Sequence, residues 1–200
     1  MALTKLNNKA VANVTSIPVA LGDMVLVSSA TASSSASIEF SLGNYKEYKF
    51  FFVNIHPSVN EAYLGINFST DNGSNYNVTK TTTNFYAFNS EPAYGNENIA
   101  YGSSYDLAQS TSFQNLTSFP IGNANDDSFV GYLHLFNPSS TTYVKHFTAR
   151  SHQSEGDSNF YTNDTFVAGY GNTTSAVNAI KFQMSSGNID SGEILLFGVN

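Results

Sequence analysis

The feature of this sequence that most restricts its fold is a period-two alternation of apolar residues, in short segments separated by Gly, Asn and Ser. Tyr45–His56 is the clearest segment: Tyr48 and Phe50 fall on one face of an extended chain, and Phe51 and Val53 fall on the other. Because successive side chains of a strand point to opposite faces, this pattern predicts a β-strand. Apolar residues on both faces predict a strand in the interior of a sheet.

Eight further segments show strand patterns between turn residues, without intervening helical periodicity. They are Met24–Val27, Ser37–Phe40, Tyr63–Ser69, Phe129–Phe136, Thr142–Ala149, Thr165–Tyr170, Val177–Met184 and Gly192–Val199. Only 12% of the residues are charged, and sixteen Phe and twelve Tyr supply rings for a core between two sheets. We therefore predict an all-β fold: an antiparallel two-sheet sandwich, jelly-roll-like, formed by residues 23–200.

Two regions are predicted to be irregular. The polar, Tyr-rich segment Asn75–Asn125 shows no clear strand, and within it Ser104–Phe113 is compatible with a short helix. Arg150–Asp157 carries most of the local charge and is predicted to form a loop.

Residues 1–22 differ from the rest because they lack aromatic residues and carry sparsely spaced apolar ones. We expect an extended N-terminal arm, which is either a first strand along the sheet edge or a segment that docks on a neighbouring subunit or particle. The apolar residues assigned to that contact are Leu3, Leu6, Val14, Ile17, Val19 and Leu21.

Charge and composition exclude several function classes. A net charge of −7 without a Lys/Arg cluster argues against nucleic-acid binding. No apolar run reaches about eighteen residues, and the N-terminus does not resemble a secretion signal, so no membrane insertion is expected. Without cysteine, a disulfide framework, a thiol nucleophile and a zinc ribbon are impossible. No nucleophile elbow or phosphate-binding loop occurs either, so we expect no enzymatic activity and no cofactor.

Two local patterns invite a site assignment. Ser69–Tyr76 resembles the Asp-box of sialidases, whose chemistry is that of a turn, so Asp71, Asn72 and Gly73 are assigned a structural role. His146, His152, Glu155 and Asp157 lie close together in sequence, but their spacing matches no helical zinc motif, and no metal site is predicted.

Aromatic residues in polar loops are the better candidates for ligand contact. Tyr94, Tyr101, Tyr105 and Tyr161 are flanked by Gly, Asn and Ser, the composition that binding loops use. A host-surface glycan is one ligand that Tyr faces and Asn amides suit; the alternative is that these are ordinary loops at the end of a sandwich.

Several segments together resemble the short virion proteins of tailed bacteriophages, especially those of marine bacteria and cyanobacteria. They are Thr31–Phe40, Tyr45–Pro57, Phe68–Tyr76, His134–Pro138, Lys145–Phe147, Ile180–Phe182 and Ser186–Gly192, within residues 24–200. The resemblance implies a jelly-roll-like domain found among capsid decoration proteins and head or tail fibres, and it brings no catalytic residues.

From this resemblance we expect a non-enzymatic virion structural protein, made in the host bacterial cytoplasm and assembled on the particle surface. Its expected partners are major capsid or tail subunits and further copies of itself, with a trimer as one arrangement. The alternative function is a tail-fibre receptor-binding protein or a carbohydrate-binding adhesin module.

Overall fold

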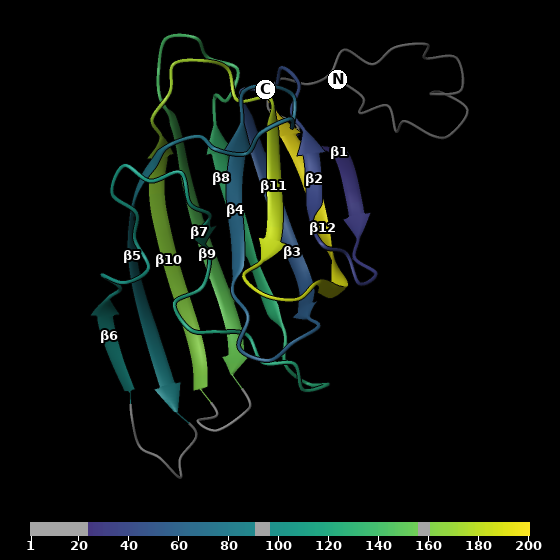
Figure 1. The fold of residues 1–200 in the computed structure, drawn as a ribbon, viewed down its shortest axis with the longest axis vertical. Helices are drawn as coiled ribbons and strands as arrows, with labels where there is room; N and C mark the ends of the chain where they lie inside the picture. Colours follow the sequence, from purple (N-terminus) through teal and green to yellow (C-terminus); the bar gives the residue numbers. More distant parts are fainter. Residues whose placement is uncertain (1–23, 91–96, 156–160) are drawn as a thin grey trace, which may run out of the picture.

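The computed structural model describes residues 24–90, 97–155 and 161–200, and these ranges form a two-layer β-sandwich (Figure 1). Twelve strands occur in them: β1 (Met24–Thr31), β2 (Ile38–Ser41), β3 (Glu47–Pro57), β4 (Leu64–Ser69), β5 (Lys80–Ser90), β6 (Glu97–Tyr101), β7 (Gln114–Asn115), β8 (Phe129–Phe136), β9 (Lys145–Glu155), β10 (Tyr161–Gly171), β11 (Ala179–Met184) and β12 (Ile189–Val199). The prediction of an all-β antiparallel sandwich is confirmed.

The strand order is that of a jelly roll with an extended sheet. The larger sheet has the order β1-β12-β3-β8-β9-β10-β5-β6, and the smaller sheet has the order β2-β11-β4-β7. Without β5, β6, β9 and β10, two four-stranded sheets remain, β1-β12-β3-β8 and β2-β11-β4-β7, which is the jelly-roll arrangement. The four extra strands therefore widen one sheet beyond the edge of the other.

An aromatic core joins the two sheets where they overlap. Phe182 on β11 lies 5.3 Å from Phe50 and 5.4 Å from Phe52, both on β3, measured between ring centroids. Phe40 on β2 completes the cluster, with its ring 5.8 Å from that of Phe50. Rings at these separations pack edge-to-face or tilted, the arrangements that aromatic pairs prefer.

A second buried layer, polar in character, lies beneath the widened part of the larger sheet. The side chains of β5, β9 and β10 on this face include Lys80, Asn84, Ser151, Gln153 and Thr165, all buried. Residues 102–121 cover this layer and bond to several of its side chains: Ser118 Oγ donates to Asn84 Oδ1 at 2.8 Å, and Ser151 Oγ donates to the carbonyl of Leu116 at 2.6 Å. Figure 1 shows this irregular chain crossing the sheet.

Three expectations for the elements are corrected. Ser104–Phe113 contains turns and bends but no helix, and Arg150–Glu155 continues β9 instead of forming a loop. The strand β5 occupies part of the region predicted to be irregular. Polar side chains face inward on these strands, and several of them bond to the covering chain, so polarity along these strands does not separate buried positions from exposed ones.

The N-terminal arm of residues 1–22, with its six contact residues, lies outside the described ranges. In the described ranges we find no helix with the length and apolarity needed to cross a bilayer.

Gly192 is required where β12 bulges against β3. Its φ is +106°, and a Cβ at this position would lie 2.5 Å from the carbonyl oxygen of Asn54. We expect Gly192→Ala to lower the free energy of unfolding by about 2 kcal/mol, from backbone strain and this clash. Chemical denaturation measures the loss. Gly43→Ala is the matched control, because its Cβ would meet only Tyr48 Oη at 3.5 Å; equal losses in the two variants would contradict the explanation.

Candidate functional site

The face of the larger sheet that points away from the smaller sheet is the candidate site, and we call it the outer face. Its side chains alternate with the buried ones; on β3, for example, Phe51 and Val53 point outward while Phe50 and Phe52 point into the core. In the described ranges, the smaller sheet and residues 102–121 lie on the opposite face. The outer face thus spans all eight strands.

One line of paired residues crosses the outer face from strand to strand, and we call it the cross-strand row. Its members, in order from β6 to β12, are Tyr101, Phe85, Phe166, Arg150, Tyr132, Phe51 and Leu195. Each is the register partner of the next, so the side chains lie side by side across a distance of about 30 Å at the usual strand spacing. Five of the seven are aromatic.

The middle of the cross-strand row is a stack of planar groups. The rings of Phe85 and Phe166 are parallel within 3° with their centroids 4.7 Å apart, and the Cζ atom of Arg150 lies 4.8 Å from the centroid of Phe166. A guanidinium over a ring is attracted to its π-electrons. Even so, Phe85 is 46% exposed and Tyr132 is 44% exposed. The stack therefore presents apolar edges to solvent.

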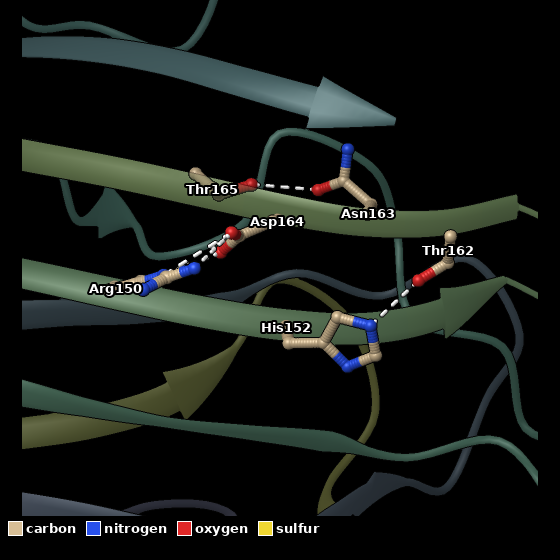
Figure 2. Close-up of polar contacts among 6 residues, drawn as sticks. All are labelled: Arg150, His152, Thr162, Asn163, Asp164 and Thr165. Carbon is tan, nitrogen blue, oxygen red and sulfur yellow. Dashed lines mark hydrogen bonds and ion pairs between the residues drawn. The ribbon is translucent and has the colours of Figure 1, made fainter. Parts of the chain in front are cut away.

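Polar contacts between β9 and β10 hold Arg150 in place, as Figure 2 shows. Arg150 Nη2 donates to Asp164 Oδ2 at 2.7 Å, and Arg150 Nε donates to Asp164 Oδ1 at 3.0 Å. These bonds raise the pKa of Arg150. Next to them, His152 Nε2 lies 2.7 Å from Thr162 Oγ1. Paired donors of this kind fix a guanidinium in one orientation.

A groove lies beside the cross-strand row. Small side chains, Thr83, Ala168 and Thr148, form its floor, while Tyr170 and His146 stand on the far side. Its volume is about 410 Å³. A second hollow of about 350 Å³ lies on the other side of the row. The cross-strand row is therefore a ridge on the outer face, with a depression on each side.

Exposed large apolar side chains gather on this face. Of the eleven in the described ranges, seven belong to it by register: Met24, Leu26, Val53, Phe85, Ile99, Tyr101 and Tyr132. Scattered apolar residues are normal on a protein surface, but a contiguous group marks a contact surface.

The tyrosines assigned to ligand loops do not converge on one site. Tyr101 belongs to the cross-strand row, and its hydroxyl donates to Asp106 Oδ2 at 2.5 Å. Tyr105 packs near Tyr63 and Tyr86, and Tyr161 packs against Phe88 and Phe119 on the opposite face of the sheet. Tyr94 lies outside the described residues.

Asp71, Asn72 and Gly73 form a tight turn after β4. Asp71 Oδ1 accepts from the backbone N–H of Asn75 at 2.8 Å, and Asn72 and Gly73 both have positive φ. Hydrogen bonds, the largest from the side chain of Asn75, lower the pKa of Asp71 to about 2. Both carboxylate oxygens of Asp71 accept hydrogen bonds within the turn, which is consistent with a structural role for the motif.

The histidines do not assemble a metal centre in the described ranges, where no group of three potential ligands occurs. His146 and His152 both point outward from β9, but they are six positions apart, about 20 Å along a strand. The side chains of Glu155 and Asp157 lie outside the described part. His134 Nε2 lies 2.8 Å from Glu47 Oε2, and His56 Nε2 lies 3.1 Å from the carbonyl of Ala124.

Comparison with known proteins adds little. No family model and no curated protein sequence matches the chain. Among solved structures, an aerolysin-like protein of Bombina maxima aligns with 81% of this chain and 89% of its own, at 12% identity and a TM-score of 0.11. A TM-score this low carries no argument about fold or function.

Proposed function

We propose that this chain is a non-enzymatic bacteriophage virion structural protein, a capsid decoration protein or a head or tail appendage that assembles on the particle surface. The resemblance of residues 24–200 to short virion proteins supports the proposal. The jelly-roll sandwich is consistent with it, but fold alone does not fix function.

The observation that carries the proposal is the composition of the outer face. Its centre is rich in Tyr and Phe, contains one oriented Arg, and has its acids Asp164 and Glu47 paired with Arg150 and His134. Aromatic residues and Arg are enriched, and unpaired charges are depleted, at the centres of protein–protein interfaces. Such a surface suits lasting contact with other virion subunits.

The test is to probe purified phage particles for the chain. Antibodies against the purified protein should detect it in gradient-purified virions, in a constant ratio to the major capsid protein. The ratio should survive a high-salt wash that removes adsorbed proteins, because apolar contact is not screened by salt. Absence of the chain from washed particles would reject the virion role.

A receptor-binding or carbohydrate-binding adhesin is the second candidate, and the groove beside the cross-strand row favours it. The groove combines threonine hydroxyls with the ring of Tyr170 and is large enough for a sugar ring. Binding to host cells that disappears when Ala168→Trp fills the groove, while particle attachment persists, would support this candidate over a purely structural role.

A further inference from the structure

We propose that the outer face packs against the outer face of a second copy of this chain, forming a sheet-on-sheet dimer. The inference deepens the proposed function, on which it rests for its view of this face as an assembly surface, by naming the partner.

The size of the face matches a protein partner. Eight strands at about 4.8 Å spacing and four rows of outward residues cover an area on the order of 700–900 Å². A standard interface buries about 800 Å² on each partner. A small ligand could cover only a fraction of the face.

The charge distribution favours a copy of the same acidic chain at this face. At the centre of the outer face, the positive charges of Lys49 and Arg150 balance the negative charges of Glu47 and Asp164. Two further acids, Glu97 and Glu193, lie on the flanking strands β6 and β12. Most other acids of the described ranges lie elsewhere: Glu39, Glu61, Asp71, Asp126, Asp127 and Asp190. Asp106 bonds to Tyr101 at the end of the cross-strand row. Each copy has a net charge of −7, so the electrostatic repulsion between two copies is smallest when they bind through this charge-balanced centre.

The cross-strand row is complementary to itself about its midpoint, which falls between Arg150 on β9 and Tyr132 on β8. A two-fold axis parallel to the strands at this point places Arg150 of each copy opposite Tyr132 of the other. The same axis places Phe166 opposite the partner's Phe51, and Phe85 opposite the partner's Leu195. An isologous interface requires this kind of self-complementarity.

The contacts that result are favourable ones. Arg150 faces an aromatic ring while its charge stays paired with Asp164, and apolar side chains face apolar side chains. Sheets packed face to face lie about 10 Å apart, so side chains of this size can interdigitate.

The first test is the mass of the full chain in solution, measured by light scattering over a range of concentrations, for the wild type and two variants. We expect twice the mass of one chain for the wild type. Tyr132→Glu should weaken the dimer at least about 30-fold, because it places a charge at the centre of the interface. Tyr143→Glu is the matched control, since Tyr143 is 68% exposed and lies outside the outer face; it should leave the dimer unchanged.

A second test does not depend on the stability of the glutamate variant. The chain has no cysteine, so Tyr132→Cys introduces a single thiol. In the dimer its Cα atom lies about 11 Å from that of its counterpart, and both thiols lie in the space between the two sheets. A short bismaleimide should link Tyr132→Cys into dimers and leave Tyr143→Cys monomeric.

Three results would overturn the inference. They are a wild type that stays monomeric at all concentrations, a dimer that survives Tyr132→Glu, and a dimer that is lost only when residues 1–22 are deleted. The virion role fails separately: a monomer found in washed particles rejects this interface alone, and a dimer absent from particles rejects the proposed function.

Discussion

Replacing Phe182 by Ala is expected to lower the free energy of unfolding by about 3–5 kcal/mol. Phe182 is completely buried, and its ring touches Phe50 and Phe52 of the larger sheet and Phe40 of its own sheet. Its removal leaves a cavity between two sheets whose backbones are held apart by their hydrogen-bonded ladders. The structure cannot close around such a cavity, so the loss includes both transfer and cavity contributions.

Denaturant unfolding followed by circular dichroism measures the change at one fixed protein concentration. Tyr143→Ala is the matched control, because a ring is removed from a side chain that is 68% exposed and lies outside the outer face. We expect it to cost no more than about 1 kcal/mol. Similar losses in the two variants would mean that the inter-sheet aromatic cluster is not the principal core.

The stability of the protein is expected to rise with pH between about 8 and 10.5 because of Lys80. This side chain is fully buried at the start of β5, and its Nζ donates to Asn67 Oδ1 at 2.6 Å and to the carbonyl of Val78 at 2.9 Å. Neither acceptor carries a charge. Desolvation therefore lowers the pKa of Lys80 to about 8, from an ordinary value of 10.5.

The direction of this change in stability with pH follows from the protons that the folded and unfolded states bind. Between the two pKa values the unfolded chain holds the proton of Lys80 and the folded protein does not, so the free energy of unfolding increases with pH. The full change is about 3 kcal/mol, of which about 2 kcal/mol is gained by pH 9.5. Below pH 8, Lys80 is charged in both states and the cost of its burial is fully present.

Denaturant unfolding at pH 7 to 9.5 measures this effect below the range in which tyrosines titrate. In Lys80→Met the rise should shrink to the smaller part that Lys145 contributes, because burial also lowers the pKa of Lys145. Lys46→Met is the control, since Lys46 is exposed, and it should retain the full rise. A wild-type stability that is flat or falling over this range would contradict the shifted pKa of Lys80.

Strand patterns predicted the fold class because the jelly-roll core obeys simple alternation. Tyr48, Phe50 and Phe52 are buried as the period-two pattern of Tyr45–His56 requires, and β3 lies in the interior of its sheet. In the widened part of the sheet the pattern fails. There Lys80, Asn84 and Thr165 face inward. Asn84 and Thr165 bond to Ser118 of the covering chain, and Lys80 bonds to Asn67 and Val78, so polarity no longer indicates exposure.

The sequence by itself determined that this chain forms a sandwich of antiparallel strands, because alternation, turn residues and abundant rings are local properties of the chain. Only the tertiary structure decided that two pairs of strands widen one sheet, and that Phe85, Phe166, Arg150 and Tyr132 form one row. These residues come from four strands, and their adjacency depends on strand order and register. Backbone pairing between distant segments sets both, and no local pattern encodes it.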